Sequence, residues 1–268
     1  MTTSDVHITE NLALDSLNLF GYLYVDTASF NVQWGSFANT KNRGELIGNI
    51  HWNDTNNFVL SLQKGKFFIQ DSIWTLKPDA QVAFKNHFIK VSDFEIYEKE
   101  NNLIVFGQIS DNPLDAIKIN FNQFNLSFLD FYTKGFDIDM DGLVIGNVEL
   151  SSIWNNPGFL SDFVVKDFKF NGVDLHEVQM NSLYSRSRKA IVLDMSIVSA
   201  DKIVKNIDLG GFFYPYEDDN QLDVEVRVNK LPVKSIAPFL TSFTSHIEGY
   251  ADGKLNLKGN LDKLVILG

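Results

Sequence analysis

The chain has 268 residues, of which 23 are Lys or Arg and 34 are Asp or Glu, so its formal net charge at pH 7 is −11. This acidic balance argues against binding to nucleic acid, which requires clustered cations, and against docking on anionic lipid through a polybasic face. The lack of cysteine excludes disulfides, thiol catalysis and cysteine-based metal centres. Hydrophobic residues make up 44% of the chain, which is ample for a folded core.

The two ends of the sequence leave two alternatives, a cytoplasmic protein or an interior piece of a longer chain, and we expect the second. Residues 1–10 are polar and lack the basic and apolar regions of a signal peptide. No run of about 18 apolar residues, the minimum for a membrane-spanning helix, occurs anywhere in the sequence. Residues 264–268 form an apolar, strand-like run that stops at a glycine.

Strands are predicted along the whole chain, because apolar and polar residues alternate with a period of two. The clearest apolar series, in chain order, are Ile117, Ile119 and Phe121; Phe136, Ile138 and Met140; Leu222, Val224, Val226 and Val228; and Leu255 and Leu257. Turn-forming clusters divide the chain into roughly 15 short strands. Helical spacing is confined to 236–243 and, more weakly, 126–132. The predicted fold is therefore all-β, an elongated, curled antiparallel sheet with one or two short helices.

An internal repeat is visible in the glycines. Gly142 and Gly146, followed by Leu150, have the same spacing as Gly249 and Gly253, followed by Leu257. Each set comes after an alternating strand and a short helix-like patch. We therefore expect one continuous segment over 1–268, with repeat units at 30–150 and 151–268.

No motif predicts catalysis or a bound metal. Residues 137–142 read Asp-Ile-Asp-Met-Asp-Gly, as at the start of a calcium-binding loop, but Val148 stands where the bidentate Glu is required. We interpret the three aspartates as the wet face of a strand. Carboxylates are too numerous to single out an acid/base pair, and tryptophans in strands are usually packing residues. The expectation is a protein that is not an enzyme and has no cofactor and no metal.

The most informative feature is an apolar face larger than the few helical stretches can cover. Such a face closes on a second sheet, as in a β-sandwich, or meets an apolar ligand. The functional interpretation is a groove for acyl chains. Its predicted lining comprises Ile117, Ile119, Phe121, Phe136, Ile138, Met140, Leu222, Val224, Val226, Val228, Leu255 and Leu257.

Several segments, taken in order, resemble a known family. From residue 30 onward the chain is similar to TamB-type translocation and assembly module proteins, especially those of Bacteroidetes-like bacteria. The segments that carry the resemblance are 71–78, 89–96, 103–110, 173–175, 191–197, 209–211, 222–228, 231–233 and 247–261.

The resemblance implies a function and a location. TamB-type proteins belong with AsmA-like and bridge-like lipid transfer proteins, which are anchored in the inner membrane, cross the periplasm and hold acyl chains in a β-groove. The chain is expected to be a periplasmic segment of such a conduit, with phospholipid acyl chains as partners. An outer-membrane barrel protein is the expected partner of a C-terminal part of the parent protein that we do not find in this sequence. The alternatives are a scaffold for outer-membrane protein assembly and a polysaccharide-binding β-sandwich or solenoid.

Overall fold

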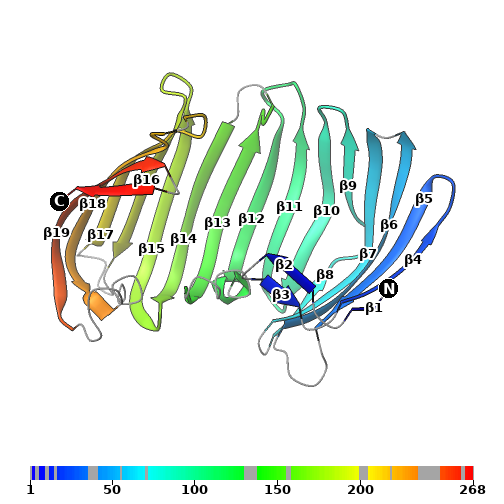
Figure 1. Ribbon diagram of the computed structural model, residues 1–268, viewed down its shortest axis with the longest axis horizontal. Helices are drawn as coiled ribbons and strands as arrows, with labels where there is room; N and C mark the ends of the chain where they lie inside the picture. Colours follow the sequence, from blue (N-terminus) through cyan, green and yellow to red (C-terminus); the bar gives the residue numbers. More distant parts are fainter. Residues whose placement is uncertain are drawn as a thin grey trace. The chain divides into compact units, whose positions relative to one another are not determined.

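The computed structural model confirms the all-β, antiparallel fold (Figure 1). It describes residues 2–3, 6–9, 12–14, 17–35, 42–54, 56–69, 72–129, 138–154, 158–198, 205–217, 219–234, 248–260 and 263–267. In these ranges the only helical segments are short 3₁₀ turns, η1 (Leu126–Leu129) and 233–234. Of the helix-like patch predicted at 126–132, the described residues 126–129 form a single 3₁₀ turn. The patch predicted at 236–243 lies outside the described residues. None of the described helical segments is long and apolar enough to cross a membrane.

Contacts divide the chain into two units, which we describe separately. Unit 1 comprises Met1–Phe136 and Glu149–Pro157, and unit 2 comprises Asp137–Val148 and Gly158–Gly268. The repeat boundaries proposed from the sequence, 30–150 and 151–268, remain a prediction.

Unit 1 is an antiparallel sheet in which strands that follow one another in the sequence are paired. Beyond the short β1 (Thr2–Thr3) and the separate hairpin of β2 (Val6–Thr9) and β3 (Leu12–Leu14), the strands are β4 (Leu17–Leu23), β5 (Thr27–Trp34), β6 (Asn42–Asp54), β7 (Asn57–Ile69), β8 (Ser72–Leu76), β9 (Ala80–Lys85), β10 (Ile89–Glu98), β11 (Asn101–Ile109) and β12 (Ala116–Asn125). The short strands β8 and β9 each pair with both β7 and β10.

Unit 2 continues the same construction. Its strands are β14 (Gly158–Phe170), β15 (Val173–Ser185), β16 (Ala190–Val198), β17 (Lys205–Phe213), β18 (Leu222–Pro232), β19 (Tyr250–Asn260) and β20 (Lys263–Leu267), each antiparallel to the next. The first nine residues of β13 (Met140–Ser151) also belong to unit 2.

Of the strand predicted over residues 136–140, the described residues 138 and 139 are not in a strand. β13 begins only at Met140, and Phe136 and Asp137 lie outside the described residues. At Asp139 the backbone N–H donates to Asn171 Oδ1 at 3.0 Å, and the carbonyl accepts from Asn171 N–H at 2.9 Å. These two hydrogen bonds with Asn171, a turn residue, take the place of strand-to-strand hydrogen bonds at Asp139.

The two glycine-marked strands, β13 and β19, differ in what the glycines do. Gly146 has φ +142°, and a Cβ there would collide with the Asp162 carbonyl. A Cβ at Gly253 would meet nothing within 4 Å. Both strands follow a strand and a 3₁₀ turn, as the repeat predicts. Gly146 of β13 allows the backbone of β14 to approach closely, whereas Gly253 of β19 has no such role.

Candidate functional site

Strand register gathers the apolar residues of unit 2 on one face of its sheet. Directly opposed residues of antiparallel strands, and residues two apart on one strand, point to the same side. One row of opposed residues crosses six strands, from β14 to β19, without a polar side chain: Phe163, Met180, Met195, Leu209, Val226 and Leu255. A parallel row contains Val165, Val178, Ile197, Ile207 and Val228. We call this side of the sheet the unit 2 apolar face.

The six lining residues predicted on β18 and β19 all lie on this face. Val224 opposes Leu257, and Val226 opposes Leu255. Their burial differs: Val224 is 2% exposed, whereas Leu255 is 37% exposed. Leu222, Val226, Val228 and Leu257 are half-buried. The face is therefore a continuous apolar surface that water still reaches in part.

Unit 1 carries its own apolar face, and three predicted residues lie on it. Phe121, Ile119 and Ile117 of β12 oppose Leu103, Val105 and Gly107 of β11, and the three β12 side chains are half-buried. One row of this face crosses eight strands: Leu19, Val32, Leu46, Gly65, Leu76, Ile96, Leu103 and Phe121. Of the remaining predicted lining residues, Ile138 and Met140 are half-buried around the start of β13, and Phe136 lies outside the described residues.

Aromatic rings lie over glycines on the unit 1 apolar face. Gly44 opposes Trp34, and a Cβ on Gly44 would collide with the Trp34 ring. Gly48 opposes Phe30 and would collide with its ring in the same way. Each ring therefore rests against the neighbouring strand instead of standing upright.

A recurring β-bulge shapes both faces and was not predicted. Four strands contain an apolar residue, two polar residues and a second apolar residue, at 91–94, 121–124, 165–168 and 228–231. The third residue of each has a positive φ, at Asp93, Gln123, Asp167 and Lys230. The first, third and fourth segments coincide with register shifts. The extra residue keeps both flanking apolar side chains on one face, as the contact between the Phe121 and Phe124 rings at 5.9 Å shows.

The apolar faces keep contact with water at many positions. Among the described strands, the extensive contacts are those between neighbours in the sheet. One aromatic cluster joins Phe128 of η1 to Trp74 and Phe124, with ring centroids 5.9 and 5.2 Å apart. A sandwich core would bury every member of the rows, whereas most members here remain half-buried.

The opposite face of unit 2 is polar and laced with ion pairs. Glu225 is 2.7 Å from Arg227 and 2.6 Å from Lys254. The hydrogen bond from Lys254 is the main reason that the pKa of Glu225 is lowered, with Arg227 adding to the effect. In unit 1, a hydrogen bond from Lys64 lowers the pKa of Glu45 in the same way. These carboxylates are held in the charged form, unlike a general acid.

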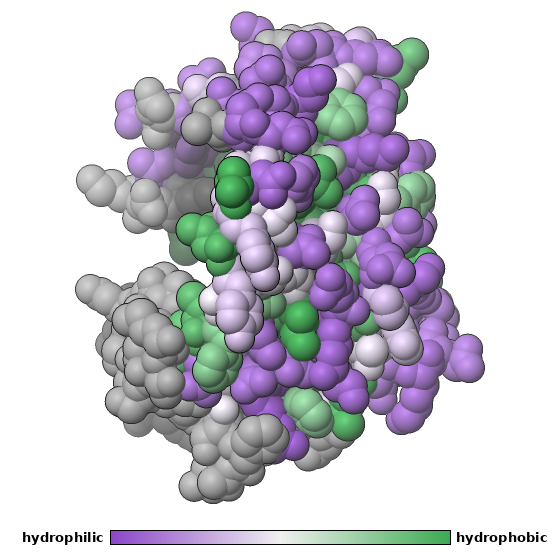
Figure 2. All heavy atoms as spheres, turned by 90° about the vertical axis from the view of Figure 1, so that its right-hand side faces the viewer, coloured by the Kyte–Doolittle hydropathy of each residue, from purple (hydrophilic) through white to green (hydrophobic). Residues whose placement is uncertain are grey.

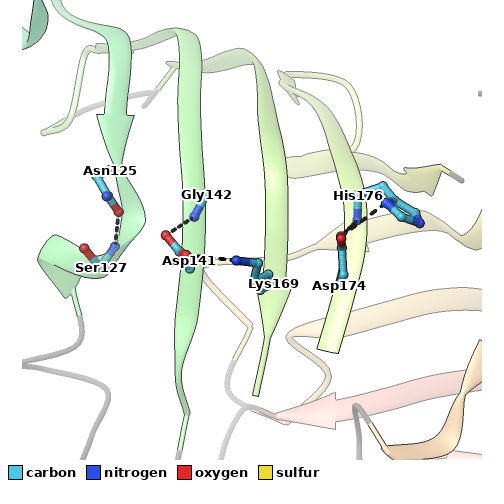
Figure 3. A network of polar contacts seen from close by, with 7 residues as sticks. All are labelled: Asn125, Ser127, Asp141, Gly142, Lys169, Asp174 and His176. Carbon is cyan, nitrogen blue, oxygen red and sulfur yellow. Dashed lines mark hydrogen bonds and ion pairs between the residues drawn. The ribbon is translucent and has the colours of Figure 1, made fainter. Parts of the chain in front are cut away.

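The residues weighed for metal or sugar binding do not converge. Figure 3 shows the Asp141 carboxylate accepting from the Gly142 N–H at 2.8 Å and lying 3.7 Å from Lys169, while His176 pairs with Asp174. Within the described ranges, no three His, Asp or Glu side chains are grouped to hold a metal. Trp74 is buried, and Trp154 stacks on His87 with centroids 5.6 Å apart. Neither tryptophan is a free platform for a sugar.

Comparisons of the chain with protein families, with characterised proteins and with solved structures find no match. Function is therefore inferred from the geometry of the two apolar faces.

Proposed function

We propose that this chain binds the acyl chains of phospholipids along its apolar faces, as a segment of a lipid-transfer conduit. The observation that carries the proposal is the unit 2 row from Phe163 to Leu255, which is apolar across six strands and half-buried for most of its length. An acyl chain laid along such a row gains about 0.8 kcal/mol per methylene removed from water. Binding of this kind needs no catalytic group and no cofactor.

The cellular setting follows from the family resemblance and belongs to the same proposal. A TamB-type conduit places this segment in the periplasm, within a longer protein anchored in the inner membrane and facing an outer-membrane barrel partner. The formal charge of −11 is compatible with this role, because the acyl chain and not an anionic headgroup is the bound part.

A scaffold for outer-membrane protein assembly is the second candidate. It is favoured by β4, a strand without charged residues that pairs with β5 along its length and with β1 at Leu17 and Asn18, and whose side chains at Leu19, Phe20 and Tyr22 are exposed. A strand of this kind is suited to adding a partner's strand by β-augmentation. This candidate predicts binding of extended peptides and no binding of free acyl chains.

The proposal is tested by placing a positively charged side chain in the row along which the acyl chain is proposed to lie. Val226 is half-buried between Leu209 and Leu255, so in Val226→Arg the guanidinium reaches water along its own stem and the fold is retained. Acyl-chain binding should fall at least about tenfold, because an apolar chain next to the charge loses its favourable transfer energy. The matched control is Asn256→Arg, which puts the same group opposite Glu225 on the polar face.

Two measurements decide the outcome. A photocrosslinking residue at position 255, where the native Leu is 37% exposed, should capture phospholipid in the parent and in Asn256→Arg but not in Val226→Arg. Thermal melting shows whether each variant is folded. Absence of crosslinked lipid in the folded parent contradicts the proposal, and unfolding of Val226→Arg would indicate a closed, dry core instead.

A further inference from the structure

The hairpin that joins β4 to β5 ends in consecutive exposed apolar residues. Tyr22 and Leu23 close β4, and Tyr24 and Val25 follow in the turn; all four are exposed, and Val25 is 98% exposed. We call these four residues the β4–β5 tip. In Figure 1 this hairpin lies at the right, and Figure 2, which faces that side, shows apolar residues standing at the surface among hydrophilic ones. A run of this kind on a soluble surface indicates a contact site.

The backbone groups of the turn are hydrogen-bonded, and the Asp26 side chain, although 60% exposed, has partners on β5 and β6. Asp26 accepts a hydrogen bond from the Thr27 hydroxyl at 3.0 Å, and its other carboxylate oxygen is 3.9 Å from His51. The Tyr24 N–H donates to the Thr27 carbonyl at 2.7 Å, and the Asp26 carbonyl accepts from the Trp52 N–H at 2.9 Å. These bonds hold the turn in shape and satisfy backbone groups that would be costly to place near lipid.

The neighbouring hairpin shows that an apolar tip is not a general feature of the sheet. Between β6 and β7 the turn contains Asn53, Asp54 and Asn56, all exposed. Asp54 accepts from the backbone N–H of Asn56, and this bond is the main reason that its pKa is lowered. The two hairpins do the same structural work, so the apolar residues of the β4–β5 tip are not required by the turn itself.

We propose that the β4–β5 tip inserts into the interface of a zwitterionic lipid bilayer. Two tyrosines that alternate with leucine and valine have the chemistry of the interfacial zone, where rings with one polar end sit at headgroup depth and aliphatic groups reach the acyl boundary. Asp26 follows the tip directly, which disfavours an anionic surface. A turn of four residues also offers far less area than the roughly 800 Å² per partner of a stable protein interface.

This inference goes beyond acyl-chain binding and does not depend on it. It concerns contact with a membrane surface, and the contact residues lie at the end of β4 and in the turn that follows, outside the row described on the unit 1 apolar face. The two proposals therefore fail separately. Displacement of a fluorescent fatty acid without any vesicles reports the first, and vesicle binding reports the second.

The experiment is co-flotation of the 268-residue chain with phosphatidylcholine vesicles. The parent should float, and the double variant Tyr24→Ser/Val25→Asp should partition at least about tenfold more weakly, because it loses the buried aliphatic and aromatic area. The control is Leu114→Asp, at a residue that is 88% exposed in the turn before β12 and outside the tip. It should float within about twofold of the parent.

A second measurement reports insertion directly. The chain has no cysteine, so Val25→Cys and Leu114→Cys each carry a single environment-sensitive label. Vesicles should blue-shift the label at position 25 and leave the label at 114 unchanged. The proposal is overturned if the parent does not float, if it floats only on anionic vesicles, or if both labels respond alike. A parent that stays off vesicles but binds another protein through the tip overturns it as well.

Discussion

The two faces of the unit 2 sheet are made from the same strands and yet differ in polarity: one is apolar and the other carries ion pairs. On β18, Val224 and Val226 belong to the apolar face, while Glu225 and Arg227, which alternate with them, belong to the polar face. The polar face is filled with ion pairs in water, which add little to stability. The apolar face is continuous across the strands and remains half-buried. Part of the apolar surface of this sheet is therefore not buried in the core of the unit.

The difference between the faces indicates where the stability of the unit resides. Because most row members keep contact with water, the hydrophobic stabilisation comes mainly from a subset of buried positions, among them Val165, Val178, Ile197 and Val224. These positions hold the sheet together, and the half-buried positions around them are available to a ligand. The predictions below test this division, beginning with the largest expected effect.

A charge at the best-buried position should be severely destabilising. Val224 is 2% exposed, so Val224→Asp buries a carboxylate without a partner and should cost about 3–5 kcal/mol of unfolding free energy. Urea unfolding followed by circular dichroism measures the loss. The control is Asn256→Asp on the polar face, two residues from both Lys254 and Lys258, which should stay within about 1 kcal/mol of the parent. Equal losses would mean that the two faces do not differ as described.

The sequence was sufficient to predict which residues share a face wherever a strand alternates without interruption. In β12, β18 and β19 each predicted apolar residue lies on the apolar face, because a period of two leaves no other arrangement of an amphipathic strand. The half-burial of the face was not predictable in the same way. It depends on whether another layer packs on the sheet, which alternation does not encode.

Interruptions of the alternation are where sequence reasoning failed. The bulge at 165–168 reads Val-Lys-Asp-Phe, with apolar residues three apart, which breaks the alternation of a strand; the positive φ of Asp167 accommodates the extra residue. Its recurrence at 91–94, 121–124 and 228–231 was the available signal. The strand predicted from Phe136 was wrong at Asp139, because an exchange of hydrogen bonds with Asn171 replaces the ladder there. Side-chain competition for backbone groups has no signature in hydrophobic periodicity.

Truncation of a half-buried row member should cost much less than truncation in a closed core. Leu255 is 37% exposed, so Leu255→Ala should lower the unfolding free energy by about 1 kcal/mol, against about 2–5 kcal/mol for a buried leucine. The same urea titration gives the value. A loss above about 2 kcal/mol would show that this side chain is covered, and the unit 2 apolar face would then resemble a sandwich core.

Two serines lie among the apolar residues of the unit 2 apolar face, and replacing them tests whether their hydroxyl groups contribute to stability. Ser161 and Ser182 oppose each other on β14 and β15, are 1% and 3% exposed, and have buried hydroxyl oxygens without a hydrogen-bond partner. Removing an unsatisfied hydroxyl relieves its desolvation cost, so Ser161→Ala and Ser182→Ala should each be neutral or stabilising by up to about 1 kcal/mol. Thermal melts compare them with the parent. A clear destabilisation of either variant would show that the hydroxyls bond to something in solution.

The smallest effect is expected on the polar face, as a dependence of stability on pH. The pKa of Glu225 is lowered chiefly by the hydrogen bond from Lys254, so the folded state favours the carboxylate more than the unfolded state does. A lowered folded pKa contributes stability above the unfolded pKa, and this contribution disappears as pH falls through the folded pKa.

Glu225→Gln should therefore reduce the drop in melting temperature between about pH 7 and about pH 3 without altering the apolar face. The reduction should be slight, because Glu225 is open to solvent and its ion pairs are screened. Molar salt should make the parent behave like the variant. If the Gln variant instead loses acyl-chain binding while remaining folded, the two faces are coupled through β18, and the separation of a stabilising face from a binding face would no longer hold.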